Sequence, residues 1–164
     1  MKIVEEINKI YQKNKKIKLF LDMDGTITEL LFDSEKIYLK EGEYLNKKPI
    51  KPIINKIKEI NKKFPLIKIN ILSCSKTKCM VKEKKEWLNR YMPDIKQRRR
   101  ILLCEETGDY TQKSVNLVKA QYIKNSLKDN ELAILIDDDI RVLSAAKEVI
   151  NDRILLFHVT SLLI

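Results

Sequence analysis

Five short segments of almost entirely apolar residues recur along this chain of 164 residues. They span residues 17–21, 67–72, 101–104, 132–136 and 154–159, and each has the length of a strand. Segments with helical spacing lie between them; in one, Ile53, Ile57, Ile60 and Phe64 share a face opposite lysines. Apolar strands that alternate with helices are typical of a parallel sheet covered on both faces. The sequence therefore predicts a doubly wound α/β fold, in which ligands bind at the carboxyl ends of the strands.

The composition fits one folded domain over residues 1–164. Hydrophobic residues make up 44% of the chain, so the chain can bury a core. No apolar run approaches the ~20 residues of a membrane-spanning helix, and residues 1–16 lack the apolar core of a signal peptide. Cys74, Cys79 and Cys104 are few, odd in number and without metal-site spacing. We therefore expect a cytoplasmic protein with no membrane partner.

The chain is strongly basic, with a formal net charge of +10. Such a charge raises the local concentration of anionic substrates. The densest basic run, residues 96–100, comes directly before the third strand, which predicts a place at the sheet edge opposite the ligand site. The run is either a solvated loop or a contact for nucleic-acid phosphates. No aromatic residues interleave with it to stack bases, which favours the loop.

Polar residues follow three of the predicted strands directly. The first strand runs into Asp22 and Asp24, the second into Ser73, and the fourth into three aspartates at 137–139. Two carboxylates on one side of a strand end repel each other and are costly to bury without a cation. Mg²⁺ suits this role because it prefers oxygen ligands. The sequence therefore predicts a magnesium site at the carboxyl edge of the sheet.

Two residues near strand ends have expected structural roles. Asp139 suits the cap of the helix that follows it, which leaves Asp137 and Asp138 as the candidate metal ligands. His158, the single histidine, has no acidic or nucleophilic neighbour in the sequence. We expect it to support the fold rather than to react.

The order of these motifs resembles that of the haloacid dehalogenase (HAD) superfamily of phosphatases. The sequence DMDGT at 22–26 matches the first motif of that superfamily, DxDG[TV]. Ser73 is similar to the Ser/Thr of the second motif, and Asp137 and Asp138 are similar to the acidic pair of the fourth. The third motif is a lysine upstream of the acidic pair. Lys119 best resembles that layout, with Lys113 second; Lys124 and Lys128 also lie in range.

The resemblance implies an Mg²⁺-dependent phosphomonoesterase with a HAD-like Rossmannoid core. Asp22 would be the nucleophile that forms an aspartyl-phosphate, and Asp24 the general acid and base. Ser73 would donate a hydrogen bond to a phosphoryl oxygen, and Lys119 would offset the phosphoryl charge. The implied metal ligands are Asp22, the backbone carbonyl of Asp24, and Asp137 or Asp138. The expected substrate contacts are Gly25, Thr26, Cys74 and Tyr44.

A closer resemblance is to the cytosolic 5'(3')-deoxyribonucleotidase-like branch. It rests on DMDGT, on EGEYLNKKP at 41–49, on INILSCS at 69–75 and on KEKKEWLNRYMPDI at 82–95. In this superfamily an insert after the first motif forms a cap that sets specificity, and here residues 27–52 would be a small cap. Its Phe32, Tyr38 and Tyr44 either stack on a base or pack the insert onto the core.

The resemblance implies a small phosphorylated substrate, most simply a nucleoside monophosphate. A small cap leaves the site open, and an open site also admits the end of a nucleic acid. The second interpretation is therefore a polynucleotide 3'-phosphatase. The third is a non-catalytic module that binds phosphate or RNA on the same fold, against which the intact Asp22, Asp24 and Asp137 argue.

Overall fold

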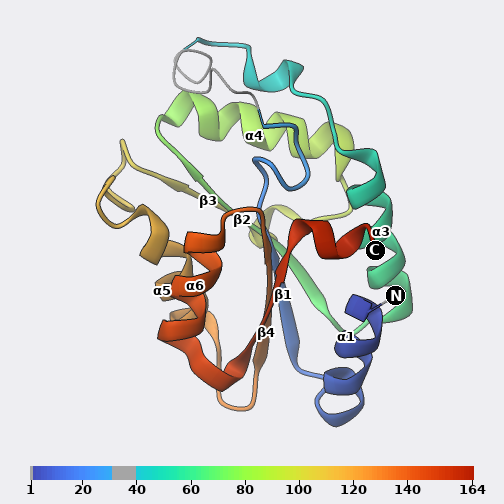
Figure 1. Cartoon of the computed structure of the whole chain (residues 1–164). Helices are drawn as coiled ribbons and strands as arrows, with labels where there is room; N and C mark the ends of the chain where they lie inside the picture. Colours follow the sequence, from blue (N-terminus) through green and yellow to red (C-terminus); the bar gives the residue numbers. More distant parts are fainter. Residues whose placement is uncertain (1, 31–39) are drawn as a thin grey trace.

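Five parallel strands form one sheet in the computed structural model, which describes residues 2–30 and 40–164 (Figure 1). The strands are β1 (Ile17–Leu21), β2 (Lys68–Ser75), β3 (Arg100–Cys104), β4 (Leu132–Asp137) and β5 (Ile154–His158). Their order across the sheet is β3-β2-β1-β4-β5, and every neighbouring pair is parallel. This confirms the doubly wound α/β fold.

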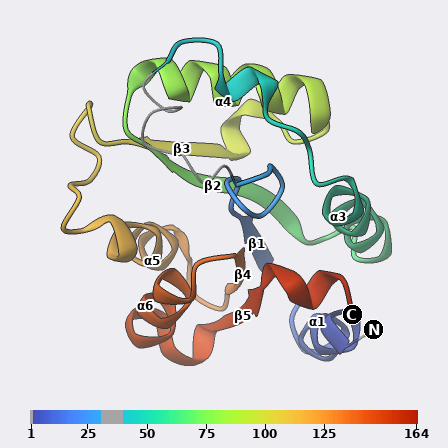
Figure 2. The ribbon, with the colours of Figure 1, turned by 45° about the horizontal axis from the view of Figure 1, so that its top comes forward.

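Helices cover both faces of the sheet (Figure 2). Helices α1 (Lys2–Lys13), α3 (Lys51–Lys63) and α4 (Lys78–Tyr91) pack on one face, and α5 (Val115–Ser126) and α6 (Ile140–Ile150) on the other. Four short 3-10 turns complete the described elements: η1 (Tyr44–Asn46), η2 (Gln97–Arg99), η3 (Asn151–Arg153) and η4 (Val159–Leu162). No helix among the described residues is long and apolar enough to cross a membrane.

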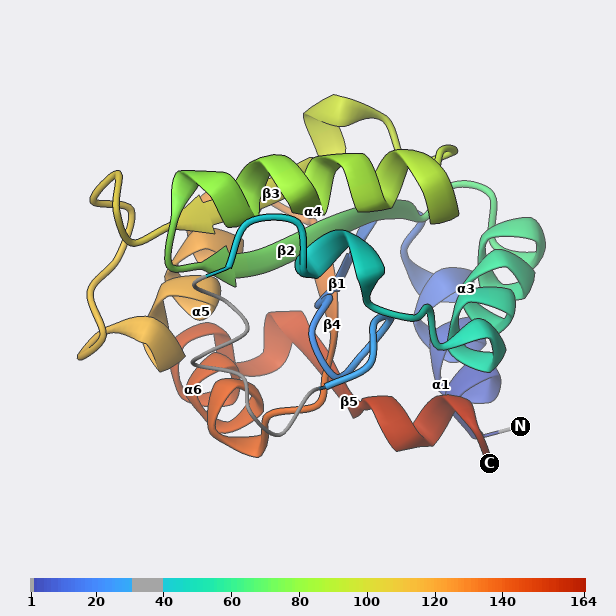
Figure 3. The same ribbon diagram turned by 90° about the horizontal axis from the view of Figure 1, so that it is seen from above.

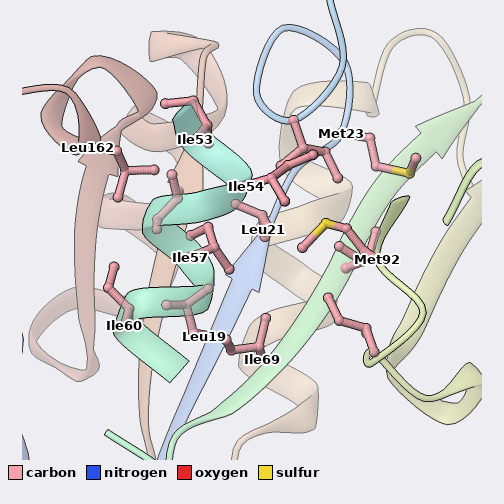
Figure 4. Packing of buried hydrophobic residues seen from close by; sticks show 14 of the residues in the cluster. Leu19, Leu21, Met23, Ile53, Ile54, Ile57, Ile60, Ile69, Met92 and Leu162 are labelled. Atoms are coloured by element: carbon pink, nitrogen blue, oxygen red, sulfur yellow. The ribbon is translucent and has the colours of Figure 1, made fainter. Parts of the chain in front are cut away.

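The two faces of the sheet bury alternate residues of each strand, because successive strand side chains point to opposite sides. Leu19 and Leu21 belong to the core under α1, α3 and α4, whereas Phe20 belongs to the core under α5 and α6. Figure 4 shows Ile57 and Ile60 of α3 facing β1. Burying each such side chain contributes roughly 1.5–3 kcal/mol, so this alternation firmly sets which face each strand residue meets.

Strand β2 is longer than the apolar run predicts. It continues through Ser73, Cys74 and Ser75, which pair with Leu102, Leu103 and Cys104 of β3. The pairing with β3 therefore extends the strand beyond its apolar residues. Helix α4 begins at Lys78, where the Thr77 side chain accepts a hydrogen bond from the Met80 amide at 3.2 Å and caps the helix.

The carboxyl ends of the strands share one edge of the sheet, and Figure 3 looks down onto it. The basic run lies at the amino end of β3, in and around η2, and therefore at the opposite edge, as predicted.

The two ends of the insert pair with each other above the carboxyl edge. The Glu29 amide donates to the Lys48 carbonyl at 3.0 Å, and the Ile50 amide donates to the Ile27 carbonyl at 2.8 Å. Residues 31–39 of the expected cap, with Phe32 and Tyr38, lie outside the described residues.

Candidate active site

Asp22 and Asp137 share one buried lysine, Lys119. The Lys119 Nζ lies 2.6 Å from Asp22 Oδ1 and 2.7 Å from Asp137 Oδ2. Asp22 and Asp137 lie on the same side of the sheet as the residues of β1 and β4 that face α5, because side chains alternate along a strand. Lys119 lies on the buried side of α5, so it contacts both carboxylates. Burial lowers the pKa of Lys119, but the two carboxylates outweigh this and raise it above its usual value.

The structure brings Lys119 into the site and leaves the other candidate lysines outside it. Lys113, Lys124 and Lys128 are all exposed, in the loop before α5, on α5 and after it. Only Lys119 among these four contacts the acidic residues in the described part of the chain.

Asp138 joins Asp22 and Asp137 in a group in which one carboxylate oxygen of each residue lies within 4.8 Å of the other two. Gly25 makes room for it: a Cβ on Gly25 would lie 2.3 Å from Asp138 Oδ2, and the backbone of Gly25 has a φ of +76°. Only glycine suits both the turn and the close approach.

These three acids carry more negative charge than Lys119 balances. Burial, with the negative charges of Asp137 and Asp24, raises the pKa of Asp22 to about 6 despite the opposing Lys119. Burial and the charge on Asp22 raise the pKa of Asp138 to about 6. Three carboxylates against one ammonium leave two negative charges, which one divalent cation would neutralise. The donor set, all carboxylate oxygen, fits Mg²⁺.

Asp24 lies outside this group of three and contacts two other lysines. Its Oδ1 is 2.6 Å from the Nζ of Lys47, which the insert provides, and its Oδ2 is 2.8 Å from the Nζ of Lys84 on α4. Burial favours a raised pKa, but Lys84 and Lys47 outweigh it and hold the pKa of Asp24 well below its usual range. Asp24 is therefore ionised in the free protein.

Lys84 also connects Asp24 to the end of β2. Its Nζ lies 2.8 Å from Ser73 Oγ and donates to the Cys74 carbonyl at 2.7 Å. Ser73 lies on the same side of β2 as the residues that face α4, because side chains alternate along a strand. Its hydroxyl therefore meets Lys84 of that helix. A phosphoryl oxygen bound at Ser73 would meet this ammonium. Burial raises the pKa of the neighbouring Cys74 thiol to about 11, so it stays protonated.

Lys47 and Lys84 are functional candidates that the sequence reasoning missed. Lys84 had a signal: it lies between Met80 and Leu88 on the inward face of α4, where a lysine is out of place. Lys47 had no comparable signal, because it follows the irregular η1 turn and has no periodic neighbours.

A hollow of about 720 Å³ opens beside the acids. Its lining also includes Gln112 from the loop before α5, Val115 and Asn116 from the start of α5, and Ile140 from the start of α6. Of the four expected substrate contacts, Cys74 lines the hollow, while Gly25, Thr26 and Tyr44 do not. Tyr44 is 2% exposed, with its ring 4.7 Å from the Nζ of Lys47, a position that fits packing of the insert. The Thr26 hydroxyl is buried without a hydrogen-bond partner among the described residues.

Asp139 and His158 support the acidic group. The Asp139 side chain accepts from the Arg141 amide at 2.8 Å and caps α6, as expected. The His158 Nε2 lies 3.0 Å from the Asp138 carbonyl, and its Nδ1 lies 2.8 Å from Thr160 Oγ1. The imidazole thus links the end of β5 to the backbone of Asp138, in keeping with a structural role.

The comparisons with known proteins agree with this architecture. No protein-family model and no curated protein matches the sequence. Among solved structures, the chain is similar to the HAD domain of the effector protein Lem4 from Legionella pneumophila, with 16% identity over 88% of each chain and a TM-score of 0.54. An inactive mutant of that domain matches with the same identity and TM-score, over 87% of this chain and 84% of the other.

The fold is a Rossmann-like α/β fold similar to that of the Lem4 HAD domain. A chain of the Pnkp1/Rnl/Hen1 RNA repair complex is also similar, with 17% identity and a TM-score of 0.62. The match covers 87% of this chain and 42% of the other, so this chain matches less than half of that protein. At these identities the likeness concerns the fold.

Proposed function

We propose that the protein is an Mg²⁺-dependent phosphomonoesterase that works through an aspartyl-phosphate on Asp22. The observation that carries this is the group of Asp22, Asp137 and Asp138 within 4.8 Å at the carboxyl edge, bridged by Lys119. Next to it lie Asp24 and Ser73, the two other groups that the HAD resemblance predicts.

The metal ligands in this proposal are Asp22, Asp137 and Asp138, with the Asp24 carbonyl as the expected fourth. Bound Mg²⁺ would screen the repulsion between Asp22 and a phosphate and hold the two in line. Lys119 keeps Asp22 and Asp137 at fixed positions and offsets part of their charge.

The reaction follows in two steps. Asp24 is ionised in the free protein, so in this mechanism it first takes up a proton as the phosphate dianion binds beside it. Asp22 Oδ then attacks phosphorus as the bond to the leaving oxygen breaks, and Asp24 gives that oxygen its proton. Water attacks the aspartyl-phosphate, Asp24 takes a proton from that water, and this proton is released when the phosphate leaves. Ser73 and Lys84 donate hydrogen bonds to phosphoryl oxygens.

The substrate that we infer is a nucleoside monophosphate. The 720 Å³ hollow is larger than a phosphate group needs, and its wall combines amides from Gln112 and Asn116 with apolar Val115 and Ile140. Apolar surface with a few polar groups is typical of small-molecule sites. The sequence resemblance to the deoxyribonucleotidase-like branch supports the same substrate.

A second candidate is a polynucleotide 3'-phosphatase. The open hollow, the net charge of +10 and the likeness to a chain of an RNA repair complex favour it. A non-catalytic phosphate- or RNA-binding role is disfavoured because Asp22, Asp24 and Asp137 are all present and close to cations.

A substrate screen tests the proposal. Deoxynucleoside 5'- and 3'-monophosphates, sugar phosphates and a 3'-phosphorylated oligonucleotide are incubated with Mg²⁺ or with EDTA. We expect Mg²⁺-dependent phosphate release from a nucleoside monophosphate, and none from folded Asp22→Asn, because a carboxamide is a poor nucleophile. Preference for the oligonucleotide would favour the second candidate. Full turnover in EDTA or by Asp22→Asn would contradict the mechanism.

A further inference from the structure

Lys47 is a lysine of the insert whose side chain lies entirely inside the protein. None of its side-chain surface is exposed, and its Nζ donates to Asp24 Oδ1 at 2.6 Å. Lysines are almost never fully buried unless paired, because removing an ammonium from water is costly. The next residue, Lys48, is exposed, so burial at this point of the chain is specific to Lys47.

Asp24 is held at both of its oxygens. Lys47 contacts Oδ1 at 2.6 Å, and Lys84 contacts Oδ2 at 2.8 Å. Because a different ammonium binds each oxygen, the carboxyl group cannot rotate without losing one of the two contacts. Charge-assisted hydrogen bonds of this kind are short and strong, so the orientation of Asp24 is well defined.

Lys47 is itself fixed to the helix that carries Lys84. The indole Nε1 of Trp87, buried on α4, donates to the Lys47 carbonyl at 2.9 Å. The Gly42 amide donates to Glu83, also on α4. The insert and α4 therefore hold Lys47 and Lys84 on opposite oxygens of one carboxylate.

The buried lysines of the site divide between two tasks. Lys119 lies between Asp22 and Asp137, on the side of the proposed nucleophile and metal. Lys47 and Lys84 lie on the side of Asp24, and only Lys84 of these two also contacts Ser73, where the phosphoryl group would bind. Lys47 is thus placed to act on Asp24 rather than on the phosphate.

We propose that Lys47 is a positioning residue that aims the Asp24 carboxyl at the leaving oxygen, so that the insert takes part in leaving-group protonation. This rests on the proposed phosphatase function. In that step the bond from phosphorus to the leaving oxygen breaks, the bond to Asp22 forms, and the proton that Asp24 takes up as the phosphate dianion binds moves to the leaving oxygen. The hydrolysis step returns a proton to Asp24 from water.

The test compares two substrates with the same phosphoryl group and different leaving groups. A nucleoside monophosphate releases a strongly basic alkoxide that needs a proton, whereas p-nitrophenyl phosphate releases a weakly basic phenolate that does not. For Lys47→Met we expect kcat/KM to fall about 10²–10⁴-fold with the nucleotide, the usual value of general acid catalysis, and less than tenfold with p-nitrophenyl phosphate. Lys48→Met is the matched control and should behave as wild type with both.

The outcomes separate this inference from the proposed function. If the wild-type protein hydrolyses neither substrate, the proposed function fails. If the wild type is active and Lys47→Met loses both activities equally, or neither, Lys47 has no role in leaving-group protonation and the inference is wrong.

Thermal unfolding adds a readout that needs no turnover. Asp24→Asn leaves two buried ammonium groups without their carboxylate, so we expect its Tm to fall. Adding Lys47→Met to that variant should raise the Tm again, because it removes one of the two ammonium groups that Asp24 neutralises in the wild type. A further fall in the double variant would show that Lys47 does not depend on Asp24, and would overturn the inference.

Discussion

Replacing Gly25 with alanine should damage metal binding far more than it damages the fold. A Cβ at this position would lie 2.3 Å from Asp138 Oδ2 and 2.6 Å from its Cγ. Since heavy atoms that are not bonded pack best near 3.5–4.0 Å, the Asp138 carboxylate must move by about 1 Å. Asp138 is one of the three acids in the candidate metal group.

The backbone cost can be separated from the contact with Asp138. Gly25 has a φ of +76°, and an L-residue in the left-handed region costs roughly 1–2 kcal/mol. For a domain of this size that corresponds to a Tm lower by about 2–8 °C. Gly108 has a φ of +84° and open space where its Cβ would be, so Gly108→Ala carries the same backbone cost without any clash.

The assay is calorimetric titration with Mg²⁺, with the Tm of each variant measured in EDTA. The Tm of both variants should fall by a similar amount. Only Gly25→Ala should bind Mg²⁺ more weakly, by about 10–100-fold, the usual effect of disturbing the groups that orient a metal ligand. If Gly25→Ala binds Mg²⁺ as tightly as wild type, or Gly108→Ala weakens binding equally, the assignment of Asp138 to the metal group is refuted.

Three further predictions concern single contacts. Lys119→Ala should lower kcat about 10²–10³-fold, because it removes the ammonium between two site carboxylates. Lys113 is exposed, so the kcat of Lys113→Ala should stay within about twofold of wild type in the same steady-state assay. A larger loss for Lys113→Ala than for Lys119→Ala would contradict the assignment of Lys119. Neutralising the arginines at 98–100 should change mononucleotide kcat/KM by less than about tenfold, since they lie at the far edge of the sheet; a larger loss with the fold intact would refute this placement. In Mg²⁺ titrations of activity, Asp138→Asn should raise the half-saturating Mg²⁺ concentration about 10–100-fold. Asp139→Asn alters a helix cap and should leave that concentration nearly unchanged. Equal shifts in the two variants would argue against the metal group.

Most of the fold could be predicted because each element has a clear local period. The apolar runs at 17–21 and 132–136 match β1 and β4 closely, and the Ile53–Ile57–Ile60 stripe marks α3. Parallel pairing then brings Asp22 and the aspartates at 137–139 to the same edge. The end of β2 was wrong by three residues, because its pairing with β3 depends on a strand that lies 25 or more residues further along the chain.

Asp22 and Asp24 do not share one cation in the structure. Two aspartates at one strand end need cations, and the sequence alone favours one metal for both Asp22 and Asp24. In the structure Asp24 is balanced by Lys47 and Lys84, and the requirement for a divalent cation falls on Asp22 and the two acids of β4 and its end.

The sequence by itself determined the sheet, the edge at which its acids meet, and Lys119 as the preferred lysine of the site. The sheet and its edge follow from periodicity and from the rule that parallel strands end at one edge, whereas the preference for Lys119 rests on the resemblance to the HAD motif layout. Only the tertiary structure decided which lysine meets which acid. In a chain with 33 basic residues, the position of Lys84 on the apolar face of its helix indicates burial, but no sequence feature indicates that Lys47 is buried or which acid either lysine meets. The partner of a buried ammonium depends on the face of the strand that carries the acid and on which helix or insert packs there, and both are set by segments far apart in the chain.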